Sequence, residues 1–331
     1  MSVRQRTIDA IERRPPDKVP YHIRFTKPAR EKMAHLYGDP DFEATLGNCL
    51  SVYRPRRFVE IRANIWQDEF GVEWDRTVDP DIGVVVNTLV SPETLGEYQF
   101  PDPHDPTLYT DFKASGNEFG DTLAVAKLSY NLFERAWSLA GMENLLTAMI
   151  ADPRFVEDLL DRLTEYYLAL IENVCRWNID AILFGDDWGT QSGLMMGPHL
   201  WRQFIKPRIA RLYQAAKANG KYVFVHCCGR VQELFGELIE CGLDVFNPFQ
   251  PEVMDVFEMK KQFGDRLTFY GGISTQQTLP FGTVADVRDE VRRLLDEVGQ
   301  SGGYIAAPAH AIPPDAKPEN IAAMIEVLQN Q

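Results

Sequence analysis

Five short apolar runs recur along the C-terminal half of the chain: Ala181-Ile-Leu-Phe-Gly185, Tyr222-Val-Phe-Val-His226, Asp244-Val-Phe-Asn247, Leu267-Thr-Phe-Tyr-Gly271 and Tyr304-Ile-Ala-Ala-Pro308. Taken together they are rich in β-branched and aromatic side chains. Strands of a parallel sheet are covered on both faces, so they read as continuous apolar runs instead of alternating ones. The five runs therefore predict buried parallel strands.

Helical patterns fill the intervals around these runs. One helix is predicted to start at Asp152-Pro153 and others to span Trp201–Ala218, Val284–Val298 and Glu319–Leu328. Lys206-Pro207 should mark a kink or a helix boundary, because proline disrupts a helix interior. Strands alternating with helices, without a glycine-rich dinucleotide fingerprint, favour a closed (β/α)₈ barrel, the TIM-barrel α/β fold, over an open sheet.

The N-terminal part of the chain is predicted to supply the first strands and an elaboration. Val19-Pro-Tyr-His-Ile-Arg-Phe25 is the predicted first strand and Leu123-Ala-Val-Ala-Lys-Leu128 the third, while no comparable run marks the second. Gly71-Val-Glu-Trp-Asp75 and Gly83-Val-Val-Val-Asn87 are short alternating pieces, typical of an inserted hairpin.

Length and composition are consistent with one barrel domain over residues 1–331, with the elaboration in about 1–120 and the clearest barrel part in about 121–331. The 48 acidic residues outnumber the 34 basic ones, for a net charge of −14, which disfavours nucleic acid and anionic membrane surfaces as partners. No run has the length of a membrane span, and five cysteines do not suggest a disulfide framework. These features predict a cytoplasmic protein with reduced thiols. Its oligomeric state, monomer or homodimer, stays open.

Val225-His226-Cys227-Cys228-Gly229 carries the sharpest chemical signal, at the end of a predicted strand. Side chains alternate along a strand, so His226 and Cys228 share a face and Cys227 points away. An imidazole and a thiolate on one face can bind one borderline cation, above all zinc. A structural histidine beside two core cysteines would give the same sequence pattern. His310 follows the predicted last strand and could reach the same barrel mouth as a third ligand or as a substrate-binding histidine, unless it is a solvent-exposed loop histidine.

Other polar residues also follow predicted strands. Asp186 and Asp187 come after the fourth strand, where either could simply cap the next loop. Asp187 is the better candidate for facing the mouth, where it would orient substrate or transfer a proton. Glu134 and Arg135 lie beyond the third strand and are further catalytic candidates, unless they are an ordinary solvated pair. Three residues complete the candidates as substrate contacts: Trp137, Trp188 and Asp68.

Between Leu123 and Asn320 the chain resembles the uroporphyrinogen decarboxylase superfamily, whose members are (β/α)₈ barrels. The resemblance rests on Phe133-Glu-Arg-Ala-Trp-Ser-Leu-Ala-Gly-Met-Glu-Asn144, Gly185-Asp-Asp-Trp-Gly-Thr-Gln191, His226-Cys-Cys-Gly229, Gly271-Gly-Ile-Ser274 and Pro308-Ala-His-Ala-Ile-Pro-Pro-Asp-Ala-Lys-Pro-Glu-Asn320. True decarboxylases of this superfamily carry an N-terminal arginine-rich loop for porphyrin carboxylates and lack His-x-Cys-Gly. This chain departs from them at both points, with His22-Ile-Arg-Phe-Thr-Lys-Pro-Ala-Arg30 in place of that loop.

Another branch of the superfamily contains zinc-dependent methyltransferases that move a methyl group to or from a corrinoid protein. His226 and Cys228 match the first two zinc ligands of that branch, and His310 stands where its third ligand is a cysteine. The resemblance thus implies a zinc enzyme of the O-demethylase type. It would move a methyl group between a small substrate, a methoxylated aromatic or a thiol, and a corrinoid carried by a partner protein. The alternatives are a metal-independent decarboxylase, with Asp187 and His310 stabilising a protonated intermediate, and a non-catalytic zinc-bearing barrel.

Overall fold

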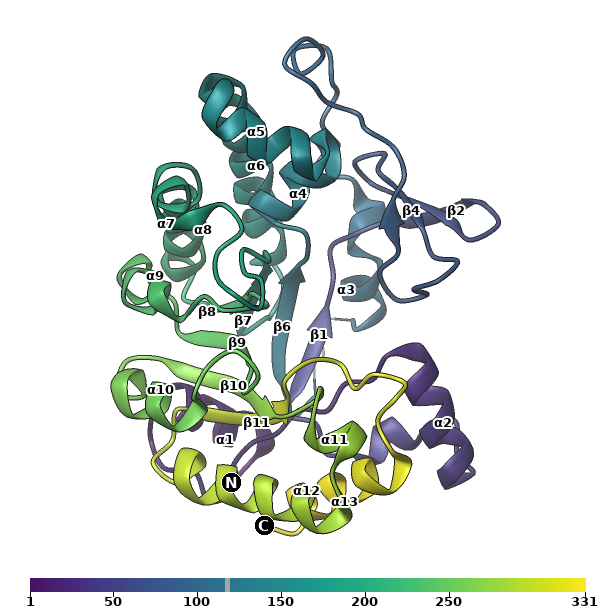
Figure 1. Cartoon of the computed structure of the whole chain (residues 1–331), viewed down its shortest axis with the longest axis vertical. Coiled ribbons are helices and arrows are strands. Elements are labelled where there is room, and N and C mark those ends of the chain that lie inside the picture. The colour runs from purple at the N-terminus through teal and green to yellow at the C-terminus, as the bar shows by residue number, and fades with distance from the viewer. Residues whose placement is uncertain (117–119) are drawn as a thin grey trace.

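The protein is described here by a computed structural model covering residues 1–116 and 120–331 (Figure 1). Its main sheet is parallel. Each strand of this sheet pairs with the next one along the chain, and the strands inserted between β1 and β6 form a separate sheet. In order, the strands are β1 (Leu50–Tyr53), β6 (Leu123–Leu128), β7 (Ala181–Gly185), β8 (Tyr222–His226), β9 (Val245–Phe249), β10 (Thr268–Ile273) and β11 (Tyr304–Pro308).

A short segment around Tyr21 closes this sheet into a barrel. Tyr21 forms a parallel bridge with Ala306 of β11, and the amide of His22 donates to the Ala306 carbonyl at 2.9 Å. On its other side, the Tyr21 carbonyl accepts a hydrogen bond of 2.9 Å from the amide of Cys49, immediately before β1. The segment lies between the last strand and β1, so the predicted barrel, with its first strand here, is confirmed.

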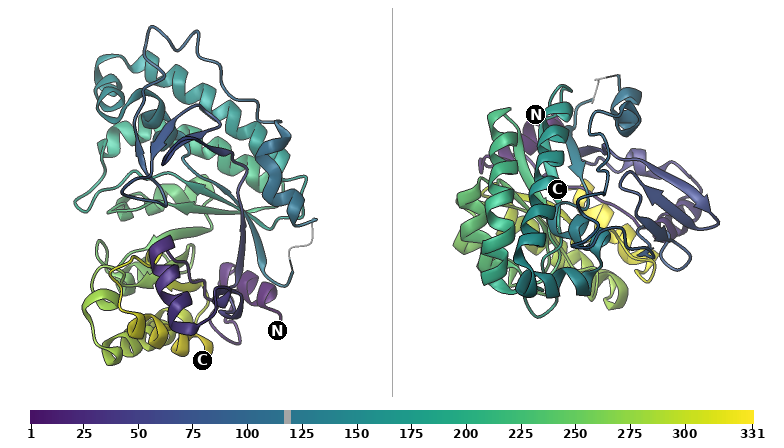
Figure 2. Two further views of the ribbon diagram at one scale, coloured as in Figure 1. Left: turned by 90° about the vertical axis from the view of Figure 1, so that its right-hand side faces the viewer. Right: turned by 90° about the horizontal axis from the view of Figure 1, so that it is seen from above.

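Helices surround the sheet and cover its outer face (Figures 1 and 2). They are α1 (Val3–Ile11), α2 (Lys27–Tyr37), α3 (Thr110–Ala114), α4 (Leu132–Ala140), α5 (Met142–Ala151), α6 (Pro153–Val174), α7 (Gly197–Leu200), α8 (Lys206–Ala218), α9 (Phe235–Cys241), α10 (Val256–Phe263), α11 (Thr278–Phe281), α12 (Val284–Arg293) and α13 (Pro318–Gln329). Ile11 packs into the barrel interior, so α1 closes the end opposite the mouth. Among the described residues, no helix combines the length and apolar character needed to cross a membrane.

The helix boundaries follow the predicted signals. The Asp152 side chain accepts a hydrogen bond from the amide of Phe155, with Pro153 opening α6. Thr283 and Asp286 form a reciprocal capping box at the start of α12. Two predicted helices differ in detail, because α8 begins only at Lys206, after a π-helical turn over Trp201–Ile205, and α12 passes into a second π-helical turn at Leu294.

The insertion between β1 and β6 is larger than the predicted hairpin. It is a four-stranded antiparallel sheet of β2 (Phe58–Arg62), β3 (Ile65–Asp68), β4 (Glu73–Asp75) and β5 (Val84–Val85). The predicted pieces do pair, as β4 with β5. The sequence showed no pattern for the other two strands, because β2 is largely solvent-exposed, β3 is mostly half-buried, and neither has a clear apolar periodicity.

The barrel strands divide their side chains between two apolar cores. Leu123 and Val125 of β6 belong to an interior cluster shared by all seven strands, whereas Ala124 and Ala126 face the helices. This alternation follows from the two-residue period of a strand. It also decides which polar side chains reach the mouth, where the carboxyl ends of all the strands meet.

Candidate functional site

Three metal-ligand side chains converge at the barrel mouth. The candidate ligand atoms of His226, Cys228 and His310 all lie within 4.8 Å of one another. His226 Nε2 is 3.5 Å from Cys228 Sγ, and the two imidazole rings have centroids 5.7 Å apart. His226 ends β8, whereas His310 follows β11, so only barrel closure brings them together. Two nitrogen donors and one sulfur donor suit zinc, and we call these three residues the ligand cluster.

The second cysteine of the pair lies outside the ligand cluster. Cys227 is fully buried, and its sulfur accepts a hydrogen bond of 3.3 Å from the Trp188 amide. Cys228 instead lies beside His226. All five cysteines fall within the described ranges, and each is a free thiol. The two adjacent cysteines therefore have separate environments, one in the core and one at the mouth.

Asn247 of β9 sets the orientation of the His226 ring. Its Nδ2 donates to the Tyr270 carbonyl at 2.9 Å, and its Oδ1 lies 2.6 Å from His226 Nδ1. Because the amide oxygen faces the ring, His226 Nδ1 carries the proton, and Nε2 turns its lone pair toward Cys228. Burial, reinforced by Lys127 and His310, holds the pKa of His226 well below its usual value. The ring is therefore neutral at pH 7 and able to ligate a cation.

The electrostatics around Cys228 explain what a cation would change there. Burial and then the carboxylates of Asp187 and Glu134 raise the pKa of the Cys228 thiol. Asp187 Oδ1 accepts a hydrogen bond of 2.8 Å from the Cys228 amide, so this carboxylate stands beside the ligand cluster. A bound metal cation inverts such shifts, because a coordinating thiol loses its proton. The donor set thus fits a divalent metal.

Asp186, next in the chain to Asp187, has a different task. It is almost fully buried and accepts hydrogen bonds from the amides of Phe133 at 3.2 Å and Glu134 at 2.8 Å. These are the first-turn amides of α4, so Asp186 satisfies orphan donors at a helix start. It also accepts from Trp188 Nε1 at 2.7 Å. The hydrogen bonds of Asp186 thus stabilise the fold, whereas Asp187 lies at the mouth beside the ligand cluster.

Glu134 enters the mouth from the first turn of α4. Its side chain is half-buried, and burial followed by the Asp187 and Asp186 carboxylates raises its pKa well above the usual range. The structure thus brings Glu134 and Asp187 together beside the ligand cluster. A carboxyl group that keeps its proton near neutral pH can donate a hydrogen bond or a proton.

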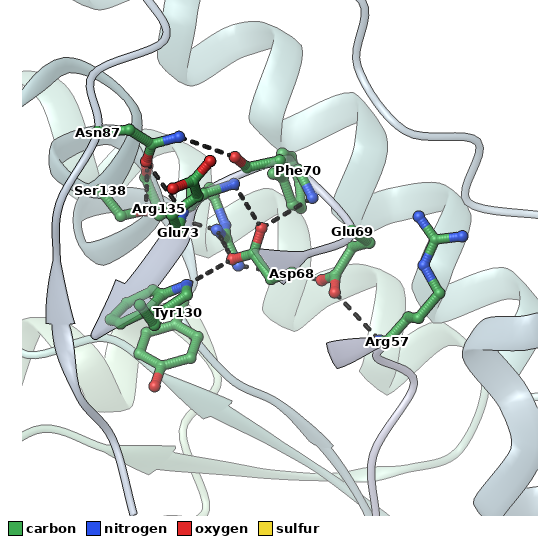
Figure 3. Close-up of polar contacts among 12 residues, drawn as sticks. Arg57, Asp68, Glu69, Phe70, Glu73, Asn87, Tyr130, Arg135 and Ser138 are labelled. Carbon is green, nitrogen blue, oxygen red and sulfur yellow. Dashed lines mark hydrogen bonds and ion pairs between the residues drawn. The ribbon is translucent and has the colours of Figure 1, made fainter. Parts of the chain in front are cut away.

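Arg135 and Asp68 lie where α4 meets the inserted sheet, and the roles predicted for them, catalytic for Arg135 and substrate-binding for Asp68, stay predictions. They form an ion pair of 2.6 Å in which both side chains are at most 1% exposed (Figure 3). Asp68 also accepts from the amides of Phe70 and Val72 and from Trp74 Nε1. These contacts tie α4 to the inserted sheet, and Arg135 also lines a small cavity together with Lys127 and Tyr130.

The same burial predicts a large effect on stability. We expect Asp68→Asn to lower the free energy of unfolding by about 3 kcal/mol, because it removes the nearer counter-ion of the buried Arg135 charge and leaves only Glu69, at 3.9 Å. Urea titration followed by circular dichroism measures this. The matched control is Arg62→Met, which breaks an exposed ion pair with Glu73 in the same sheet and should cost less than about 1 kcal/mol. Equal losses in both variants would contradict the structural role.

The two tryptophans proposed as substrate contacts also lie in the framework. Trp188 is fully buried, packs edge to face on Trp201 with ring centroids 5.6 Å apart, and donates to Asp186. This corrects the prediction for Trp188, because neither ring face is free. Trp137 is half-buried and packs at 6.4 Å against Trp74 of the inserted sheet. Its substrate role stays a prediction.

Two cavities flank the ligand cluster. A cavity of about 10 Å³ is lined by residues that include Arg24, His226 and His310. A second, of about 320 Å³, is lined by residues that include Cys228 and His310. The ligand cluster therefore lies between two spaces, of which only the second has room for a small molecule.

Sequence reasoning overlooked Asn247 and Lys127 as site residues. Asn247 stands at the end of a predicted strand, a position that could have identified it. Lys127 is a charged residue inside an apolar strand, on the same face as Leu123 and Val125. A cation at an interior-facing strand position is itself a signal, because such burial is costly.

Comparison with known proteins places these features in a wider context. A profile of the uroporphyrinogen decarboxylase (URO-D) family matches residues 70–331, a range that includes the ligand cluster. The chain is 27% identical over 190 residues to "Methylcobamide:CoM methyltransferase MtaA" of Methanosarcina barkeri. This alignment covers 57% of this chain and 53% of that protein. It is 24% identical over 187 residues to a uroporphyrinogen decarboxylase of Methylococcus capsulatus, and this alignment covers 54% of this chain and 50% of that protein. The chain thus spans about half the length of these relatives.

A longer alignment and a solved structure complete the comparison. A uroporphyrinogen decarboxylase of Coxiella burnetii is 23% identical over 358 residues, covering 98% of this chain and 94% of that protein. Among solved structures, a methyltransferase from Methanosarcina mazei superposes with a TM-score of 0.73 at 18% identity, over 100% of this chain and 99% of that one. That similarity supports the fold.

Proposed function

Because the chain belongs to the uroporphyrinogen decarboxylase family, we propose that it is a zinc-dependent methyltransferase acting between a small substrate and a corrinoid protein. The observation that carries this proposal is the convergence of His226, Cys228 and His310 at the barrel mouth. The relatives described as methylcobamide:CoM methyltransferases support corrinoid-linked methyl transfer over uroporphyrinogen decarboxylation. The methyl-bearing molecule would be a methoxylated aromatic or a thiol.

Each residue at the mouth has a separate part in the proposed reaction. The ligand cluster would hold zinc, which when bound acts as a Lewis acid and stabilises negative charge on a substrate oxygen or sulfur atom. Asp187 stands beside Cys228, where it would orient the substrate. Glu134, with its raised pKa, would hold a proton near that position. The corrinoid would be carried by a partner protein that approaches the mouth.

A metal-independent decarboxylase is the second candidate. The observation in its favour is the alignment with the Coxiella burnetii uroporphyrinogen decarboxylase, which covers 98% of this chain. In that reaction Asp187 and His310 would stabilise a protonated intermediate, and no metal would be needed. The two candidate functions therefore differ in whether the barrel mouth must hold a metal ion.

The test is cobalt methylation followed by absorption spectroscopy. Zinc-loaded protein is mixed with reduced corrinoid protein and a panel of methoxylated aromatics and methylated thiols. We expect at least one donor to methylate the cobalt. The proposal fails if no donor does so while the metal-free protein releases carbon dioxide from a carboxylated substrate.

Asn247 offers a prediction about metal binding that needs no turnover. Asn247→Leu removes the acceptor for His226 Nδ1 and should weaken zinc binding by about 10–100-fold, the usual effect of losing such an outer partner. Asn247→Asp keeps a carboxyl oxygen at this position and should bind zinc nearly as tightly as the unmodified protein. Competition with a chromophoric chelator measures both affinities. Equal zinc affinity in all three proteins would show that Asn247 does not position the ligand.

A further inference from the structure

The larger space beside the ligand cluster, of about 320 Å³, is lined by uncharged polar side chains and is here called the amide cavity. Besides two members of the ligand cluster, four residues supply its polar side chains: Thr190, Gln191, Gln250 and Gln276. No acid, lysine or arginine is among the described residues that line it. A charged group entering this space would lose water without gaining an oppositely charged side chain, whereas a neutral polar group could exchange hydrogen bonds with water for bonds with amides. The lining therefore favours an uncharged polar group.

Gln250 is the lining glutamine that the fold holds in place. It directly follows β9 and is only 8% exposed. Its main-chain carbonyl accepts hydrogen bonds of 3.2 Å from the amides of Val253 and Met254, and its side-chain Oε1 accepts one of 3.3 Å from the Gly229 amide. Only the oxygen of a carboxamide can accept from an N–H group, so this bond directs Oε1 to Gly229 and leaves Nε2, with its two protons, for other partners.

The loop that carries Gly229 is itself fixed against the loop after β7. A Cβ atom placed on Gly229 would lie 2.5 Å from the carbonyl carbon of Gly189 and 2.7 Å from the Thr190 carbonyl oxygen, so the two loops touch through their main chains. Gly229 also has a φ of +90°, which favours glycine there. Because Gly229 directly follows Cys228, the Gln250 carboxamide is anchored one residue away from a member of the ligand cluster.

The Nε2 atom of Gln250 is the unused donor of this arrangement. Within residues 1–116 and 120–331 it has no hydrogen-bond partner. A donor shielded from bulk water is unfavourable without a partner, so such a group normally meets a water molecule or a ligand. The Gln250 side chain lines the amide cavity together with Cys228 and His310. One ligand in this cavity could therefore accept a hydrogen bond from Nε2 while another of its atoms lies at the ligand cluster.

We propose that Gln250 is a specificity-determining residue, which donates a hydrogen bond from Nε2 to an uncharged oxygen acceptor of the small molecule whose reacting atom lies at the ligand cluster. This inference rests on the proposed function for the identity of the reacting atom, and on the amide cavity for the chemistry of the acceptor. It narrows the substrate class to methoxy compounds or thiols with a neutral carbonyl or ether oxygen near the reacting atom. A hydrocarbon group of the same shape would leave the Nε2 donor unpaired, and a site with such a donor discriminates against that analogue.

Two neutral thiols of nearly the same shape test the donor. Calorimetry on the zinc-loaded full chain compares 4-mercaptobutan-2-one with 3-methylbutane-1-thiol, in which a methyl group replaces the carbonyl oxygen. We expect the ketone to bind at least about 5-fold more tightly, because only the ketone pairs the Nε2 donor. Gln250→Glu keeps an oxygen for the Gly229 amide but lacks the NH₂ group, and Gln250→Met lacks it without adding charge, so both should lose the preference. The control is Gln277→Glu, an exposed position that does not line the amide cavity, which should retain it.

Nuclear magnetic resonance of ¹⁵N-labelled protein distinguishes this inference from the proposed function. The Gln250 side-chain amide signals, identified by their absence in Gln250→Met, should move further downfield with the ketone than with 3-methylbutane-1-thiol, as a new hydrogen bond requires. If the preference and the shift are found but no donor methylates cobalt, only the methyltransferase proposal fails. Failure of the ketone to bind, equal affinity for the two thiols, or an unchanged preference in the folded Gln250 variants would overturn the inference.

Discussion

His226→Ala and Cys228→Ser are each expected to lose bound zinc, whereas Cys227→Ser is expected to keep it. The first two variants remove donors that lie within 4.8 Å of the other candidate ligand atoms. Two remaining donors do not make a stable site, so the zinc content should fall from about one ion per chain to below about 0.1. Cys227 is buried in the core and faces the Trp188 amide, away from the ligand cluster.

Elemental analysis of the three purified variants decides this, with anomalous scattering at the zinc edge to locate the ion. Cys227→Ser is a matched control, because it makes the same chemical change one residue away. His310→Ala completes the set and should behave like His226→Ala if His310 is a ligand. Equal zinc content in all of these proteins would remove the ligand cluster from consideration as a metal site.

Removing zinc with a chelator is expected to abolish methyl transfer, and adding zinc back is expected to restore it. Breaking a carbon–oxygen or carbon–sulfur bond leaves negative charge on the departing atom, which a cation held by the ligand cluster would stabilise. The expected loss is at least about 1000-fold in rate, because a Lewis acid at this position supplies several kcal/mol of charge stabilisation. The assay is the cobalt methylation measurement, run on the same preparation before chelation, after it, and after zinc is restored.

Circular dichroism of the metal-free protein is the necessary control, since unfolding would also abolish activity. A folded metal-free protein that still methylates cobalt would contradict the role of zinc. A decarboxylase that relies on Asp187 should survive chelation, because its chemistry needs a carboxylate near a developing positive charge. Carbon dioxide release by the folded metal-free protein would therefore favour the second candidate.

Much of the fold could be predicted from local pattern. The five apolar runs of the C-terminal half became β7 to β11, and Asp152-Pro153 and Thr283 begin helices as their residue types predict. The second barrel strand, β1, could not be found, because Leu50–Tyr53 is short and only its first residue is fully buried. The inserted sheet was underestimated for a similar reason, since β2 is largely exposed and most of β3 is only half-buried.

The candidate site was predictable where strand geometry alone decides. His226 and Cys228 share a side of β8 because of strand alternation, and His310 joins them because all strand ends of a barrel open onto one mouth. The same rules did not reveal that Trp188 lies in the core, or that Arg135 pairs with an aspartate 67 residues away. Those outcomes depend on the path of the loops and of the insertion.

The amino-acid sequence by itself therefore determined the barrel, the order of its strands and the strand ends at which ligand side chains stand. These features follow from the two-residue period of strands, the 3.6-residue period of helices and the local preferences of capping residues. Only the tertiary structure decided which polar residues face the mouth and which form buried hydrogen bonds that stabilise the fold. Asp186 and Asp187 are chemically identical neighbours, yet Asp186 accepts hydrogen bonds from amides of α4 whereas Asp187 accepts one from the Cys228 amide beside the ligand cluster. The physical reason is that a buried polar group must find partners, and those partners come from segments far away in the chain.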